Sequence, residues 1–181
     1  HDMVQSNGRA NKWSVDLQDG MLYLRSEGQS YKLTPSAIND DSWHHVAVVL
    51  RRRGNLRTFV DNSPVSSHGV AQIGGLSGNS FWIGARGFIN TNNEITVDQE
   101  FTGKIDELRL WKLARATEQI DHDRYNEIDF NSLGLMLYAR MTEPTPPEAA
   151  GPAYYHAAAN ETVLSSAAKL SAGAVNYTTD A

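Results

Sequence analysis

Short runs of alternating apolar and polar residues, separated by turn-forming residues, fill the chain from residue 13 to residue 111. The first run, residues 13–17, alternates strictly, and a second apolar run covers residues 21–24. The pair Asp19-Gly20 stands between them, and such a pair is among the strongest local signals of a two-residue β-hairpin. Closely spaced strands and turns of this kind predict an all-β sandwich or barrel.

The most apolar segment is residues 43–50, in which odd- and even-numbered positions are both largely apolar. Because successive strand residues point to opposite faces, we predict a central strand that is covered on both sides. A turn at residues 51–55 leads into a strand over residues 56–61, so the two strands form a second hairpin. Asn62, Ser63 and Pro64 are predicted to close the strand over residues 56–61, since proline cannot donate to a ladder.

Further strands are predicted over residues 30–33, 81–84, 104–111 and 133–141. Residues 87–100 are instead rich in Asn, Thr and acidic residues and are predicted to form a long loop. Long polar loops on a rigid scaffold commonly carry function.

The hydrophobic period changes after residue 111. Thr117 is predicted to cap a short helix near residues 117–125, with Glu118 favourably placed at the positive end of the helix dipole. The pattern therefore predicts an all-β fold with one short helix.

Composition divides the chain into three parts. Residues 1–141 are predicted to form the β-sandwich, and residues 142–152 a proline-rich linker. Residues 153–181 are rich in Ala and Ser, and we expect a tail or the start of a following domain.

Charge and cysteine content narrow the partners and the chemistry. Asp and Glu number 21 against 16 Lys and Arg, and the net charge of -5 argues against a nucleic-acid partner. No apolar run approaches the roughly 20 residues that span a bilayer, so no membrane span is expected. The chain has no cysteine, which excludes disulfides and thiolate metal sites.

Several segments, in order, resemble the laminin-G-like, concanavalin A-like lectin/glucanase superfamily, of the variety found in bacterial surface proteins. They are Ser-Trp-His-His-Val-Ala-Val at 42–48, Leu-Arg-Thr-Phe-Val-Asp at 56–61, Phe-Trp-Ile-Gly-Ala at 81–85, and residues 101–111 followed by 114–120. The resemblance implies an antiparallel jelly-roll β-sandwich in an extracellular or cell-surface protein, of bacterial type.

The resemblance also carries expectations about single positions. Asn62 replaces the usual glycine of a turn, which is tolerable because Asn also accepts a positive φ. Asp106 is expected to fix neighbouring loops through hydrogen bonds. Because the family has several strands before the position of Trp13, we expect the sandwich to be N-terminally incomplete and completed by those strands or by another chain.

Catalysis is the least favoured chemistry. Glucanases of this superfamily place their acids on one strand face in a Glu-x-Asp-x-x-Glu pattern, and retaining glycosidases need two carboxylates about 5–5.5 Å apart. The nearest approach here is residues 94–100, which lacks that pattern. We therefore expect no enzymatic activity, with a glycoside hydrolase or lyase as the alternative.

Ligand binding is predicted in the acidic segment and on one nearby tryptophan. The candidate residues are Asn92, Asn93, Glu94, Asp98, Glu100 and Trp82. Many relatives hold one calcium ion at the rim of the sandwich, and the oxygens of this segment are of the type that calcium prefers. Calcium is therefore the one cofactor to consider, although no ligand set can be assembled from the sequence.

Other aromatic and histidine residues are predicted to pack. Trp13, Trp43 and Trp111 lie within predicted alternating strands, where core packing is the default. The neighbours His44 and His45 would point to opposite strand faces, so packing is favoured over shared metal binding.

Together these features predict a non-catalytic binding or adhesion module. Its expected partner is a glycan or a surface protein, and its expected setting is a larger secreted or cell-surface polypeptide. A structural spacer without a ligand is a further alternative, because fold alone does not determine function.

Overall fold

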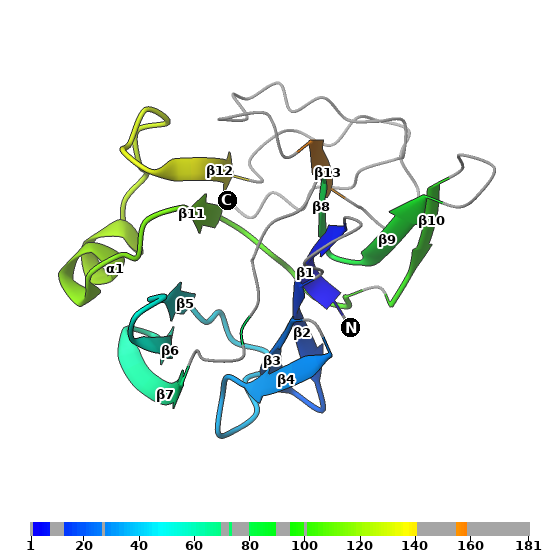
Figure 1. The fold of residues 1–181 in the computed structure, drawn as a ribbon, viewed down its shortest axis with the longest axis horizontal. Coiled ribbons are helices and arrows are strands. Elements are labelled where there is room, and N and C mark those ends of the chain that lie inside the picture. Colours follow the sequence, from blue (N-terminus) through cyan, green and yellow to red (C-terminus); the bar gives the residue numbers. More distant parts are fainter. Residues whose placement is uncertain are drawn as a thin grey trace.

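The computed structural model in Figure 1 describes residues 2–7, 13–26, 28–69, 73, 80–89, 95–99, 101–140 and 155–158. Its elements are β1 (Asp2–Asn7), β2 (Trp13–Gln18), β3 (Met21–Ser26), β4 (Gln29–Lys32), β5 (Val46–Leu50), β6 (Asn55–Val60), β7 (Ser63–Gly69), β8 (Ser80–Ile83), β9 (Arg86–Ile89), β10 (Ile95–Asp98), β11 (Leu108–Trp111), α1 (Thr117–Asp123), β12 (Leu135–Ala139) and β13 (Tyr155–Ala158).

The first layer is a six-stranded antiparallel sheet in the order β13-β8-β1-β2-β3-β4. The Asp19-Gly20 pair forms the predicted tight turn between β2 and β3, and both residues have positive φ, 52° and 76°. Positive φ at both central positions is the geometry whose twist matches a hairpin. The predicted hairpin is therefore confirmed.

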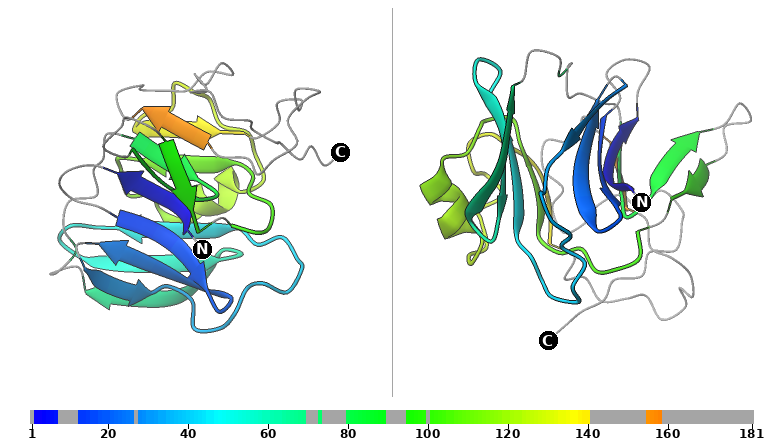
Figure 2. Two further views of the ribbon diagram at one scale, coloured as in Figure 1. Left: turned by 90° about the vertical axis from the view of Figure 1, so that its right-hand side faces the viewer. Right: turned by 90° about the horizontal axis from the view of Figure 1, so that it is seen from below.

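The second layer contains the sheet β5-β6-β7 and the pair β11-β12. Figure 2 shows these strands facing the first layer, with α1 on the far side of the second. Val46, Val48 and Leu50 of β5, together with Leu108 and Leu110 of β11, pack against the buried cluster between the layers. The fold is thus a two-layer antiparallel β-sandwich with one short helix, as predicted.

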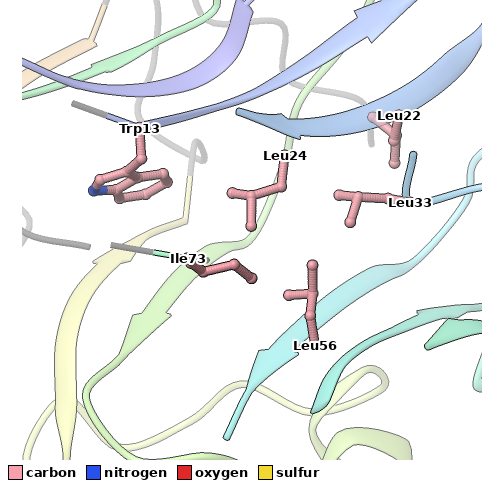
Figure 3. Packing of buried hydrophobic residues seen from close by; sticks show 6 residues of the cluster. All are labelled: Trp13, Leu22, Leu24, Leu33, Leu56 and Ile73. Atoms are coloured by element: carbon pink, nitrogen blue, oxygen red, sulfur yellow. The ribbon is translucent and has the colours of Figure 1, made fainter. Parts of the chain in front are cut away.

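The core between the layers is formed by large apolar side chains from both sheets (Figure 3). Leu24 and Leu33 from the first layer meet Leu56 of β6, and none of the three is more than 2% exposed. The full buried cluster comprises Trp13, Leu22, Leu24, Leu33, Leu56 and Ile73. At about 2 kcal/mol for each fully buried large side chain, this cluster is a main source of stability.

The prediction for residues 43–50 is partly right. Both faces of β5 are covered, because Ala47 and Val49 pack with Phe59 and Ile120 beneath α1 while the alternate residues face the core. The strand is not central, however, since β6 lies between β5 and β7. It also begins only at Val46. At the preceding residue the Asp61 N–H donates to His45 O, while the His45 N–H donates to the side chain of Asp61.

The strand predicted over residues 56–61 does end before Pro64, at Val60, but Pro64 itself lies in a further strand. Asp61 and Asn62 form a two-residue turn with φ of 49° and 66°, and β7 follows as an unpredicted strand. Pro64 is accommodated because the register shifts between Thr58 and Phe59, opposite the start of β7, and because β7 is the outer strand of its sheet.

The segment predicted as a long loop contains a hairpin instead. β9 and β10 pair antiparallel, with Ile95 opposite Ile89 and Asp98 opposite Arg86. The alternation of apolar residues at 95 and 97 is the strand signal that the polar composition concealed.

The helix α1 is confirmed, but its N-cap lies one residue earlier than predicted and it ends at Asp123. Ala116, with extended φ and ψ, is the N-cap in place of Thr117. Because alanine has no polar side chain, the cap is closed from the other side: Gln119 Oε1 accepts the Ala116 N–H at 2.9 Å.

β1 and β13 were not predicted as strands. β13, from the segment expected to be a tail or the start of another domain, pairs with β8 at the edge of the first layer. The domain boundaries and the jelly-roll connectivity remain predictions.

Candidate binding site

One end of the sandwich carries a crossing segment between β4 and β5 that passes from the first layer to the second (Figure 2). The β2–β3 turn holds this segment on one side. Ile38 N–H donates to Gly20 O at 2.8 Å, and a Cβ at Gly20 would lie 2.1 Å from the Asn39 side-chain oxygen. Position 20 therefore requires glycine for its positive φ and for this close approach.

His44 holds the other side of the crossing segment. Its Nδ1 lies 2.7 Å from Asp61 Oδ2 in the β6–β7 turn, and its Nε2 lies 3.0 Å from Asp40 Oδ1. The His45 N–H donates to Asp61 Oδ1 at 3.0 Å, and the Ser42 N–H donates to Asp40 Oδ1 at 3.1 Å. We call His44, Asp40 and Asp61 the His44 clamp, and residues 39–44 with 61–62 the clamp rim.

The charges of the clamp support one another. Hydrogen bonds to Asp61 and then to Asp40 raise the pKa of His44 above its ordinary value. The hydrogen bond with His44 is the main cause that lowers the pKa of Asp40. For Asp61, partial burial raises the pKa, but the bonds from His44 and the His45 N–H outweigh it, so the pKa is lowered.

Trp43 lies in the middle of the clamp rim and is 59% exposed. The prediction that it packs in the core is wrong, because β5 begins three residues later and strand alternation does not reach it. Trp13 does lie in the core, and Trp111 is half-buried with the Arg115 guanidinium 4.1 Å above its ring. Of Trp13, Trp43 and Trp111, it is thus the exposed Trp43 that lies beside the clamp.

A second polar network ties α1 to β11 and β12. The Arg109 guanidinium donates to the backbone oxygens of Asp123 and Asn126 and to Glu107 Oε2. Tyr138 donates its hydroxyl to the same Glu107 oxygen, and its ring lies 5.0 Å below Arg109. The Arg109 side chain is only 11% exposed, so we interpret this Arg109 network as structural.

Asp106 has a smaller role than the resemblance implied. It accepts the N–H of Glu107 at 2.8 Å, which supports the positive φ of 52° at Glu107. Burial raises the pKa of Asp106. This hydrogen bond is local, and links between loops run through Glu107 and Arg109.

The two adjacent histidines differ in environment. His45 is half-buried, and burial followed by the charges of Arg124 and Arg109 lowers its pKa, which agrees with the packing interpretation. His44 is held by hydrogen bonds rather than by packing. In the part of the chain that the structure describes, no three His, Cys, Asp or Glu side chains are arranged to hold a metal ion.

The residues predicted to bind a ligand are not brought together by what the structure describes. Asp98 ends β10 opposite Arg86, and Trp82 in β8 is paired with Gln5 and His156. Asn92, Asn93, Glu94 and Glu100 lie outside the described residues. The site at the 92–100 segment, with calcium, stays a prediction.

The clamp was missed in the sequence because its members are 4 and 17 residues apart. The only signal was a Trp-His-His run before one apolar strand and a Val-Asp pair at the end of the next. The register Val46↔Val60 is what places His44 beside Asp61. Pairing of the two strands was predicted, but the consequence for these side chains was not.

The protein is therefore a β-sandwich domain, and the rim at one end of the sandwich presents an exposed tryptophan, Trp43, beside the carboxylates of Asp40 and Asp61. The chain belongs to the concanavalin A-like lectin/glucanases superfamily: a laminin-G-type family model matches residues 2–121, which include the whole clamp rim. No curated protein and no solved structure matches the chain. Among the residues that the structure describes, no helix is long and apolar enough to cross a membrane; α1 has only 7 residues.

Proposed function

We propose that this domain is a non-catalytic recognition module that binds a glycan at the clamp rim, within a larger secreted or cell-surface polypeptide. The observation that carries the proposal is the exposure of Trp43 on a segment that is held from both sides. A surface protein is the alternative ligand for the same rim.

Physically, an exposed indole is suited to the apolar face of a sugar ring. Burying a large aromatic side chain against a ligand gains on the order of 1–3 kcal/mol. Because the clamp and the Gly20 contact already order the segment, little additional backbone entropy is lost on binding. The exposed carboxylates of Asp40 and Asp41 supply acceptors for hydroxyl groups beside the ring.

The charges of the rim disfavour catalysis there. A glycosidase needs one carboxyl group that keeps its proton near neutral pH. Asp40 and Asp61 share one imidazole, and the pKa of each is lowered, so both remain ionised. Asp106 has a raised pKa, but its neighbour Glu107 is occupied by Arg109 and Tyr138.

Binding to a glycan array tests the proposal. The purified chain is expected to bind a subset of neutral glycans, and Trp43→Ala is expected to weaken that binding by at least about tenfold, which corresponds to about 1.4 kcal/mol. Tyr125→Ala is the matched control, because Tyr125 is an aromatic residue that is 72% exposed but lies just after α1.

Three outcomes would contradict the proposal. Equal loss in both variants would show a general effect of exposed aromatic residues rather than a site at Trp43. Binding that survives Trp43→Ala but is lost in Asp98→Asn would move the site to the β9–β10 hairpin. An array without any bound glycan would favour a surface-protein ligand or a structural spacer.

A further inference from the structure

His44 places a group that titrates above the two aspartates at the centre of the clamp. Both ring nitrogens face carboxylate oxygens, at 2.7 Å and 3.0 Å. An ionised carboxylate can only accept hydrogen bonds, so two such bonds require an N–H on each nitrogen. Only the imidazolium form has both.

Loss of the proton therefore breaks more than a charge interaction. A neutral imidazole keeps one N–H, and its other nitrogen turns a lone pair toward a carboxylate. One of the two links is then lost, and the crossing segment is held by the remaining side-chain bond and by backbone contacts. The ring is accessible for this reaction, because the His44 side chain is 20% exposed.

We propose that the protonation state of His44 switches the clamp rim between a braced and a released state, and so controls how Trp43 is presented. The switch itself depends only on the clamp geometry. Its control of binding rests on the function proposed above.

The charged groups around His44 determine the direction of the switch. Asp40 faces it from the crossing segment and Asp61 faces it from the β6–β7 turn. Arg124, which ends α1, acts on Asp61 and on His45, and Arg109 of β11 acts on His45. The two carboxylates contact His44 directly and dominate, so the imidazolium persists above the ordinary pKa of 6.5.

The linkage between protonation and folding determines the pH range in which the clamp stabilises the rim. Because the pKa of His44 is raised in the folded state, its contribution is complete below pH 6.5 and is lost as the pH rises through the raised value. Because the pKa values of Asp40 and Asp61 are lowered, their contribution is present above pH 3.8 and is lost as the pH falls through the lowered values. The braced state thus occupies the window between these limits, and an alkaline shift releases it.

Nuclear magnetic resonance of the intact chain tests the switch without any ligand. The His44 ring is followed through a pH titration, together with ¹⁵N relaxation of residues 40–45 and of the Trp43 indole. Between pH 3.8 and pH 6.5, order parameters near 0.85 are expected, and above the pKa of His44 they are expected to fall toward 0.6. Asp61→Asn and His44→Gln are expected to show the lower values at every pH.

His68→Gln is the matched control. His68 lies at the opposite end of β7 and contacts Lys32 O, so its loss is expected to leave the titration of the rim unchanged. Titration of His44 without a change in the order of residues 40–45 would overturn the switch. So would identical relaxation profiles of Asp61→Asn and the wild type.

The same samples separate the switch from the proposed function. If binding requires the braced state, glycan affinity falls in proportion to the imidazolium fraction, about tenfold at one pH unit above the His44 pKa. A rim that changes order while no glycan binds supports the switch and contradicts the function. Glycan affinity that stays constant while the rim changes order supports the function and overturns its control by His44.

Discussion

The Arg109 network and the His44 clamp join loops to the same sandwich by similar means but under different conditions. Each has one cation that bridges two segments through charge-assisted hydrogen bonds. The Arg109 side chain is 11% exposed and the His44 side chain 20%. Arginine side chains are effectively always charged in proteins, whereas His44 loses its charge as the pH rises through its raised pKa. The same arrangement is therefore permanent around arginine and conditional around histidine.

The permanent network lies beneath α1, next to the core, and the conditional clamp lies at the surface. The Arg109 network anchors α1, which covers one face of β5 and β6, so its loss would expose apolar side chains. The clamp holds only a surface segment at the end of the sandwich. A conditional link is tolerable there, because releasing it leaves the core intact.

Arg109→Met is the most severe test of the comparison. It leaves Glu107 without its cation and removes the donor to two backbone oxygens, so the free energy of unfolding is expected to fall by about 3 kcal/mol. Urea denaturation measures this, with Arg53→Met in the exposed β5–β6 turn as the control, expected within about 0.5 kcal/mol of the wild type. A loss below about 1 kcal/mol would mean that the network does not anchor α1.

Tyr138→Phe tests the Arg109 network with a smaller change. It removes the hydrogen bond to Glu107 and the longer one, 3.4 Å, that the hydroxyl accepts from Arg109. The ring stays beneath Arg109, so a loss of about 1 kcal/mol is expected. Burial, and then the bond to Glu107, raise the pKa of Tyr138, so this contribution is present below pH 10 and is lost as the pH rises through the raised value. Denaturation midpoints of the two proteins are expected to converge in strongly alkaline buffer, and a constant difference would contradict this account.

Asp61→Asn is expected to have the smallest effect on global stability, below about 1 kcal/mol, because the pair that it breaks is partly exposed. Its effect should be largest between pH 3.8 and pH 6.5, where Asp61 is ionised and His44 is protonated in the folded state. Denaturation at pH 3, 5 and 9 measures the profile. A destabilisation that does not vary with pH would show that the clamp contributes through packing rather than through charge.

The two hairpins show what local sequence can predict. The Asp19-Gly20 turn and the β5–β6 hairpin follow from alternation and turn chemistry within about a dozen residues. β7 was missed because the rule for Pro64 assumes a regular ladder, and only a register shift at an outer strand accommodates it. The β9–β10 hairpin was missed because polar composition outweighed a short alternation.

Trp43 shows the limit at the level of a single residue. Its sequence neighbourhood is that of a strand, and periodicity assigned it to a buried face. The strand starts only at Val46, three residues after Trp43, and the carboxylate of Asp61 accepts the His45 N–H just before it. Local periodicity therefore does not show where the strand begins, and in the structure Trp43 lies outside it and is exposed.

The sequence by itself determined the family, the sandwich and most of its strands, because these depend on periodicity and on turn residues that act locally. Only the tertiary structure decided which polar groups meet at the rim. Contacts such as that between His44 and Asp61 depend on strand register and on the path of the crossing segment, and both result from packing the two layers on a common core.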